Sequence, residues 1–197
     1  MNVFVVYCHP SKDSFTYQVK EAFLEGLKAK GHRYIVSDLY TMGFNPVMSE
    51  EEYKREAFYN MDIEVPKDVV REQEKINASD VIVFIYPDFW TSSPAMLEGW
   101  FQRVWTYGFA YGPNQTMKVL DKAIFMITMG GTLNDQLRKD QLEAMKTVML
   151  GDRISTRCKA TEVYVFDRMT RGYDNMPNRQ AKAIKFCKDV YDLAYNL

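Results

Sequence analysis

Three short segments of the sequence place polar residues or glycines directly after an apolar run. They are the segments from Cys8 to Ser14, from Asp88 to Ser92 and from Thr128 to Thr132. Open α/β sheets bind ligands beyond the carboxyl ends of their parallel strands, which is where such segments would lie. Together the three suit a flat aromatic ligand that carries a phosphate.

The first segment leads into a helix that the apolar spacing predicts over Phe15–Lys30, with Gly31 as its end. The free N–H groups and the dipole at a helix N-terminus favour an anion, and His9, Ser14 and Thr16 add side-chain donors. The alternative is that Ser14 only caps the helix and His9 is an ordinary loop residue. The segment has no G-x-x-x-x-G-K-[ST] pattern and no strand is followed by G-x-G-x-x-G, so neither a nucleoside triphosphatase nor a classical dinucleotide fold is indicated.

The second segment follows a strand predicted over Val81–Tyr86, which Pro87 should end. It contains Trp90, a candidate stacking surface whose alternative role is ordinary packing. Ser93 is then expected to cap a helix from Pro94 to Trp105, because a hydroxyl before a proline marks a helix start.

The third segment contains Gly130 and Gly131, which would let backbone N–H groups approach a ligand closely. Taken alone, the pair is also typical of an ordinary turn. A phosphate site, an aromatic plane and a glycine-lined edge at one sheet edge are what flavin mononucleotide requires, because its ring is broad, apolar and rimmed by hydrogen-bonding groups.

Strands and helices alternate along the chain, which predicts βαβ units. Helices are further expected from Ser49 to Tyr59 and over Asp68–Asn77, Asn134–Leu150 and Asn178–Tyr195, and strands over Val3–Tyr7, Tyr34–Ser37, Val81–Tyr86, Ile124–Met129 and Val163–Phe166. The simplest closure is an α/β fold, a flavodoxin-like doubly wound five-stranded parallel sheet of order 2-1-3-4-5 with helices on both faces. Residues 1–197 are expected to form a single domain.

Composition narrows the class of protein. The 197 residues carry a net charge of -1, which gives no general attraction to nucleic acid or an anionic membrane. We expect a cytoplasmic protein, because no apolar run approaches the roughly 20 residues of a membrane span. Three cysteines without a C-x-x-C pair suggest reduced thiols, and two histidines leave little material for a metal site.

A longer set of motifs resembles the flavodoxin-like NAD(P)H:quinone oxidoreductase family, and within it the bacterial modulator of drug activity B type. The motifs span most of the chain from Val3 to about Gly131. They are His9-Pro10 with Ser14-Phe15-Thr16, Tyr86-Pro87 through Trp90, Pro94 to Trp100, Arg103-Val104, Gly108 to Tyr111 and Gly130-Gly131.

The resemblance implies a flavin cofactor and NADPH as co-substrate. FMN is expected and FAD is the alternative, because no extension is seen that would cover the adenine of FAD. It also implies a homodimer in which Tyr111 reaches the substrate face of a partner subunit's site. The implied flavin-binding residues are His9, Ser14, Phe15 and Thr16 for the phosphate and ribityl chain, Pro87, Asp88, Phe89, Trp90 and Thr91 for one side of the ring, and Thr128, Met129, Gly130 and Gly131 for its pyrimidine edge.

The chain departs from the family pattern at two places. Animal members have a Tyr and a His soon after the glycine pair that are thought to relay charge, and the segment from Thr132 to Gly151 contains neither. The Gly-Gly amides would then stabilise charge on the ring without a titrating side chain. Asp88 and Phe89 stand where many relatives have an apolar and a polar residue.

The leading function is ping-pong hydride transfer from NADPH to flavin N5, followed by two-electron reduction of a quinone. Reduction of azo or nitro compounds at the same site is the nearest alternative. A flavodoxin-type electron carrier is disfavoured by the weak net charge, and a regulatory subunit of a transporter stays open.

Two groups of residues carry further expectations. Basic residues after the glycine pair would favour NADPH over NADH by binding the 2′-phosphate, unless they are ordinary solvated surface charge; they are Arg138, Lys139, Arg153, Arg157 and Lys159. Four aromatic residues are more than one helix end can easily bury, so we expect some of them to face a second subunit; they are Trp105, Tyr107, Phe109 and Tyr111.

Overall fold

The fold is built on a parallel sheet of five strands in the order β2-β1-β3-β4-β5, as predicted. The structure is a computed structural model that describes residues 1–170 and 178–197. The strands are β1 (Asn2–Tyr7), β2 (Arg33–Asp38), β3 (Val81–Pro87), β4 (Leu120–Thr128) and β5 (Cys158–Phe166).

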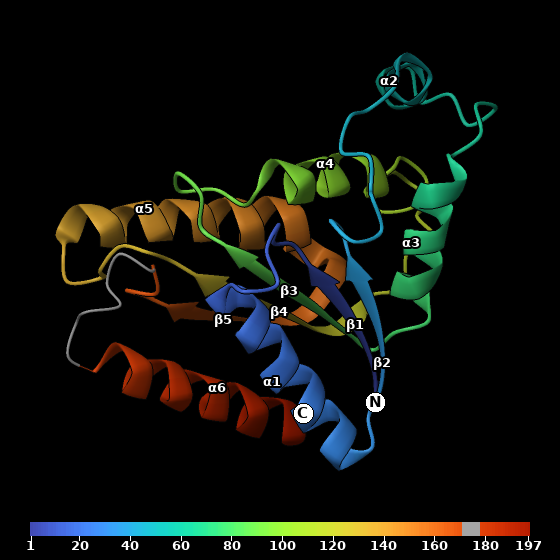
Figure 1. Cartoon of the computed structure of the whole chain (residues 1–197). Helices are drawn as coiled ribbons and strands as arrows, with labels where there is room; N and C mark the ends of the chain where they lie inside the picture. The colour runs from blue at the N-terminus through green and yellow to red at the C-terminus, as the bar shows by residue number, and fades with distance from the viewer. Residues whose placement is uncertain (171–177) are drawn as a thin grey trace.

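Helices cover both faces of the sheet (Figure 1). Helices α1 (Phe15–Lys30) and α6 (Arg179–Tyr195) lie on one face, and α3 (Lys67–Asn77), α4 (Ala95–Val104) and α5 (Gln136–Lys146) lie on the other. Each face has its own apolar core, one beneath α1 and α6 and the other beneath the remaining three helices.

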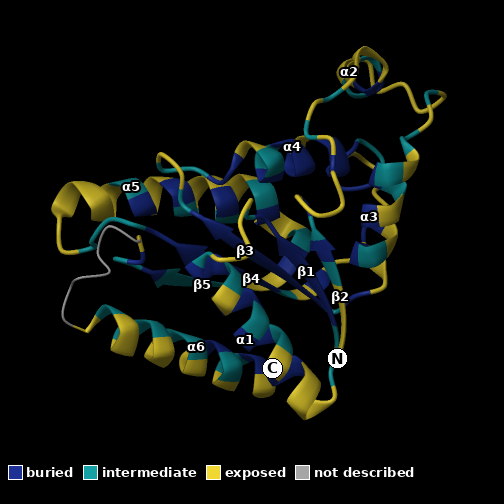
Figure 2. Ribbon diagram, in the orientation of Figure 1, coloured by how far each residue is buried: buried dark blue, intermediate teal, exposed yellow. Residues whose placement is uncertain are grey.

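Strand β3 lies at the centre of the sheet and every one of its residues is buried. Double coverage explains why its sequence is apolar without alternation. The edge strand β2 starts with three exposed residues, and Figure 2 shows the contrast between the buried centre and the exposed outer surfaces of the helices.

Several element ends differ from those predicted. The third strand is one residue longer than predicted, because Pro87 is its last residue, opposite Thr128, and not the first residue beyond it. Helix α4 begins one residue later than expected, and Ser93 does not cap it, because its hydroxyl donates instead to Glu98 Oε1 at 2.7 Å. The helix predicted to Leu150 is α-helical only to Lys146.

An irregular segment replaces the end of that helix. A π-helical stretch, η1 (Thr147–Ile154), is followed by a single 3₁₀ turn, η2 (Ser155–Arg157), before β5. π-Helical geometry is rare and is found mostly at functional sites or where a sequence is under local strain. Its inner residues Met149 and Ile154 are buried against the core.

Helix α2 (Glu50–Ala57) stands away from the sheet in a projecting part of the chain that we call the α2 lobe, residues 40–65 (Figure 1). Its predicted capping box is confirmed, because Ser49 and Glu52 exchange side-chain and backbone hydrogen bonds. The buried guanidinium of Arg103 on α4 fastens the lobe, binding Glu52 at 2.7 Å and Asp68 at 2.7 Å. Among the described residues, no helix is both long and apolar enough to cross a bilayer.

Candidate functional site

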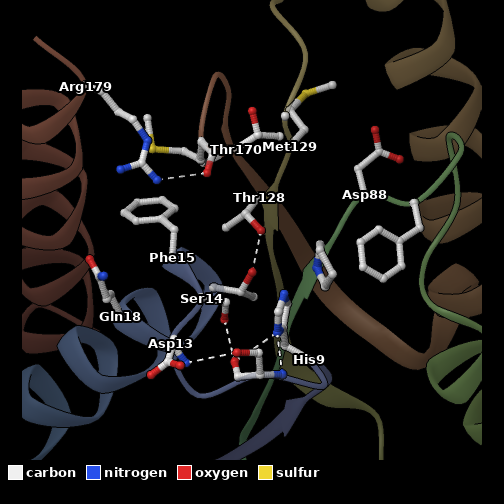
Figure 3. Close-up of a pocket in the computed structure, with 16 residues that line it drawn as sticks. His9, Asp13, Ser14, Phe15, Gln18, Asp88, Thr128, Met129, Thr170 and Arg179 are labelled. Carbon is white, nitrogen blue, oxygen red and sulfur yellow. Dashed lines mark hydrogen bonds between the residues drawn. The ribbon is translucent and has the colours of Figure 1, made fainter. Parts of the chain in front are cut away.

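A cavity of about 740 Å³ opens at the carboxyl ends of β1, β3 and β4, where the sequence predicted a site (Figure 3). The strand ends bring together residues far apart in the chain. The cavity is lined by His9, Ser11, Asp13, Ser14, Phe15, Thr16, Gln18, Pro87, Asp88, Phe89, Thr128, Met129, Gly130, Met169, Thr170 and Arg179.

Most of the predicted site residues therefore meet in one place, and Trp90, Thr91 and Gly131 are the exceptions. Trp90 is 100% exposed and projects into solvent, so it does not wall the cavity in this structure. The carbonyl of Gly131 accepts the N–H of Arg168 at 2.9 Å, which directs this residue toward the segment after β5.

The loop between β1 and α1 is ordered by its own side chains. Ser14 Oγ accepts the N–H of Tyr17 at 3.1 Å and donates to the carbonyl of Ser11 at 2.8 Å, so Ser14 is both the helix cap and a cavity residue. His9 Nδ1 lies 2.9 Å from the backbone nitrogen of Ser11 and 3.0 Å from its carbonyl oxygen, so it accepts from the first or donates to the second according to the tautomer of the ring. Burial lowers the pKa of His9, which favours the neutral ring.

Thr16 and Thr128 join two sides of the cavity. Their hydroxyl oxygens lie 2.7 Å apart, and both residues are buried. Thr16 belongs to the first turn of α1, where backbone N–H groups have no acceptor within the helix. The loop, the helix end and the β4 edge thus form one polar wall suited to a phosphate and a polyhydroxylated chain.

Asp88 brings a carboxyl group to the opposite side of the cavity. Its N–H donates to the carbonyl of Thr128 at 2.7 Å, and its Oδ1 is buried without a hydrogen-bond partner among the described residues. Burial raises the pKa of Asp88, and the N–H of Thr91 and the charge of Arg138 oppose that rise only partly. The cavity therefore contains a carboxyl group for which the charged form is disfavoured.

Beside Asp88, the chain turns sharply between Phe89 and Ser92. The two residues exchange backbone hydrogen bonds of 2.9 and 3.2 Å, and the residues between them, Trp90 and Thr91, have φ of 56° and 62°. Positive φ at both central positions is the signature of a type I′ turn, which normally contains Asn and Gly. A bulky and a β-branched residue there cost on the order of 1–3 kcal/mol each.

Gly130 allows a close approach between the ends of β4 and β5. A Cβ atom at this position would lie 2.1 Å from Cγ2 of Thr170, which also lines the cavity. The second glycine of the pair has no such neighbour, because its nearest contact is Arg138 Nε at 3.5 Å. The two glycines therefore have different roles, and only the first is required by packing.

Sequence reasoning missed the contribution of the segment after β5 and of the start of α6. Met169, Thr170 and Arg179 line the cavity from that side, and Arg179 Nη2 donates to the carbonyl of Met169 at 3.2 Å. The predicted strand order contained the signal, since β5 lies beside β4 and its carboxyl end reaches the same sheet edge. Ser11, Asp13 and Gln18 were also missed, although they flank predicted site residues.

Tyr111 and the aromatic residues before it lie away from this cavity. Trp105 and Phe109 are buried within the chain, contrary to the expectation that four aromatic residues are too many for it. The hydroxyl of Tyr111 donates to Glu56 Oε2 at 2.7 Å, and the ring of Tyr107 packs on Tyr59 with centroids 4.8 Å apart. These two tyrosines thus connect the end of α4 to the α2 lobe.

The prediction that the basic residues after the glycine pair form a single site is wrong. Lys159 lies at the start of β5, at the sheet edge opposite the cavity, and pairs with Asp121 at 2.6 Å. Arg157 Nε donates to the carbonyl of Ala110 at 2.9 Å, and Arg153 pairs with Asp152 at 2.6 Å. Sequence proximity did not reveal these separate partners, because the π-helical segment and the parallel strand carry the residues apart.

Comparison with known proteins agrees with this architecture. A family model described as a flavodoxin-like fold matches residues 1–186. The solved NAD(P)H:quinone oxidoreductase from Methanothermobacter marburgensis is 36% identical, with a TM-score of 0.88 over 100% of this chain and 96% of that one. An FMN-dependent NADH-azoreductase from Bacillus anthracis, solved with FMN, shares the fold at 13% identity and a TM-score of 0.73 over 99% and 98% of the two chains.

Curated relatives carry the same enzyme name. Rat NAD(P)H dehydrogenase [quinone] 1 is 37% identical over 149 residues, which cover 65% of this chain and 53% of the relative. The chain thus spans about half the length of this relative. The match of the family model over nearly the whole chain and the close structural likeness establish that the chain belongs to the flavodoxin-like quinone oxidoreductase family.

Proposed function

We propose that this protein is a flavin-dependent NAD(P)H:quinone oxidoreductase. The observation that carries the proposal is the open cavity in which the β1–α1 loop, the β3 edge and the β4–β5 edge converge. One end of the cavity is polar and lies at a helix N-terminus, and the other is bounded by the Asp88–Phe89 and Met129–Gly130 segments. This division fits a phosphate at one end and a ring at the other.

The residues of the chain fit FMN in distinct roles. Ser14 and Thr16 would hold the phosphate with the first-turn amides of α1, and the imidazole of His9 would add a side-chain donor. Pro87 to Phe89 and Thr128 to Gly130 would bound the ring. A bound flavin supplies a two-electron acceptor for hydride and a donor for quinone, so the protein binds, orients and excludes water.

The cavity also supports the finer reaction scheme. Since it is one open space, nicotinamide and quinone would use the same face in turn, which gives ping-pong kinetics. The backbone N–H of Gly130, which lines the cavity, would stabilise negative charge at the ring edge in place of the absent Tyr–His relay. We propose FMN rather than FAD because FMN is the flavin named in two solved structures of the same fold. Residues 1–197 would act as one flavin-binding domain, and the bacterial subtype and cytoplasmic location stay predictions.

We further propose a homodimer in which the α2 lobe faces the partner subunit. The lobe exposes seven large apolar side chains, which a monomer would leave in water; they are Tyr40, Met42, Val47, Tyr53, Phe58, Tyr59 and Met61. Tyr111 is tied to this lobe through Glu56, so the lobe and Tyr111 would reach the partner's site together.

Two measurements test the proposal. The purified protein should bind FMN and then oxidise NADPH or NADH continuously with menadione, giving parallel double-reciprocal plots. An electron carrier would bind FMN without turnover, and failure to bind either flavin would reject the proposal altogether. Light scattering should give the mass of a dimer, and Phe58→Ser combined with Tyr59→Ser should reduce it to that of a monomer.

A further inference from the structure

Glu98 links the Phe89–Ser92 turn to two other elements of the molecule. It lies in the first turn of α4, and its Oε1 accepts the hydroxyls of Ser92 at 2.9 Å and Ser93 at 2.7 Å. On the other side, Arg153 of η1 approaches Oε2 at 3.4 Å. Glu98 therefore connects the turn to both α4 and the π-helical segment.

Few other contacts hold the turn in place: the Asp88 carboxylate accepts backbone N–H groups of Thr91 and Ser92, and the Phe89 ring lies beside the His9 ring with centroids 6.5 Å apart. Both of its central residues have positive φ, and the Trp90 side chain is 100% exposed, so its ring contributes no packing energy in compensation. Within the turn, two backbone hydrogen bonds join Phe89 to Ser92. On its cavity side, Asp88 and Phe89 line the proposed flavin site. A backbone that is strained and unpacked needs an external anchor to stay in one conformation.

We propose that Glu98 is a positioning residue that holds the Phe89–Ser92 turn in the conformation required for flavin binding, through the paired hydroxyls of Ser92 and Ser93. This inference rests on the proposed flavin site. Glu98 contacts neither the cavity nor its ligand and acts only through the turn. Loss of the anchor would let the turn relax toward ordinary φ values and move Asp88 and Phe89 from the cavity edge.

The geometry allows the hydrogen bonds from the two serine hydroxyls to be tested separately from the Glu98–Arg153 ion pair. Both serine hydroxyls donate to the same oxygen, Oε1, and a carbonyl oxygen has two lone pairs. Glutamine at position 98 would keep that acceptor while losing the charge that faces Arg153. Glu98→Gln should therefore preserve the turn, whereas Glu98→Ala should release it.

The first measurement needs no flavin. Hydrogen exchange of the backbone amides in residues 88–93 should rise by about tenfold in Glu98→Ala and in the double variant Ser92→Ala with Ser93→Ala, which removes both donors. Glu98→Gln should exchange like the wild type. Glu143→Ala is the matched control, because Glu143 is an exposed glutamate of α5 whose carboxylate pairs with Lys146 on the surface.

The second measurement is FMN affinity, followed by quenching of flavin fluorescence. Glu98→Ala and the double serine variant should bind FMN about tenfold more weakly, equivalent to about 1.4 kcal/mol, with Glu98→Gln close to the wild type. Equal exchange and affinity in Glu98→Ala and Glu143→Ala would overturn the inference, as would a Gln variant as impaired as the Ala variant. A wild-type protein that binds no flavin would instead reject the proposed function, and the exchange comparison would still decide whether Glu98 holds the turn.

Discussion

The hydroxyl oxygens of Thr16 and Thr128 lie 2.7 Å apart and connect the first turn of α1 to the last residue of β4. This pair closes the inner wall of the cavity between two elements that are 112 residues apart in sequence. One hydroxyl must donate and the other accept, so the second lone pairs stay free for a ligand. The contact thus fixes the distance between the proposed phosphate end and the ring end of the site.

Replacing Thr16 by Val should lower the free energy of unfolding by about 1–3 kcal/mol, because the buried hydroxyl of Thr128 loses its partner. Thr128→Val should have a similar effect, and the double variant should be less destabilised than the sum of the two. Urea denaturation of the four proteins forms a double-mutant cycle. Additive losses would show that the two hydroxyls do not depend on each other.

Two substitutions of Trp90 distinguish the effect of its backbone conformation from the effect of its ring. Trp90→Ala and Trp90→Gly both remove the ring, but Gly accepts a φ of 56° without strain. The Gly variant should be more stable than the Ala variant by about 1 kcal/mol. Both should bind FMN equally weakly if the exposed ring folds over the bound flavin, which titration of each variant would measure. Unchanged FMN affinity in both would assign Trp90 no part in binding.

The strand order and the position of the cavity were predictable from sequence, because buried parallel strands are apolar without alternation, as β3 is. The exposed position of Trp90 was not predictable from sequence. Its sequence context indicated only an aromatic residue in a loop, whereas its exposure follows from two consecutive positive φ values. The anchor that accompanies this conformation, Glu98, lies on a helix and resembled an ordinary surface charge. Arg179 was not predicted, because it lies on α6, beyond β5, and the predicted site comprised only the segments after β1, β3 and β4.

Asp88 should make stability depend on pH. Since burial raises its pKa in the folded state, the folded protein holds this proton more tightly than the unfolded chain does. The contribution of Asp88 to the free energy of unfolding therefore falls as pH rises through the interval between the two pKa values. Asp88→Asn should be more stable than the wild type at pH 7, and this advantage should shrink as the pH is lowered from the raised folded-state pKa to the ordinary aspartate value. Denaturation at several pH values checks this, and an advantage independent of pH would contradict it.

Gly130 should not tolerate a side chain while Thr170 is present. Gly130→Ala would place Cβ 2.1 Å from Cγ2 of Thr170, and overpacking of this kind costs about 1–3 kcal/mol. Combining it with Thr170→Ser removes that methyl group and should restore most of the stability. Gly131→Ala is the matched control, since its nearest neighbour would lie at 3.5 Å. Thermal unfolding of the three variants decides, and equal losses for the two glycines would contradict the packing argument.

The choice between NADPH and NADH should not depend on Arg157 or Lys159. Arg157 Nε donates to the carbonyl of Ala110 at 2.9 Å, and Lys159 pairs with Asp121 at the opposite edge of the sheet, so neither guanidinium nor ammonium faces the cavity. Arg157→Gln should lower the free energy of unfolding by about 1.5–3 kcal/mol through loss of a charged donor, whereas Lys159→Gln should leave the unfolding midpoint unchanged because its pair is exposed.

The ratio of kcat/KM for NADPH to that for NADH should be the same in both variants as in the wild type. Among the described residues, the cation that lines the cavity is Arg179, and Arg179→Gln is the comparison that shows the assay detects a change in binding. A tenfold fall of the ratio in Arg157→Gln would show that its guanidinium reaches the 2′-phosphate after all.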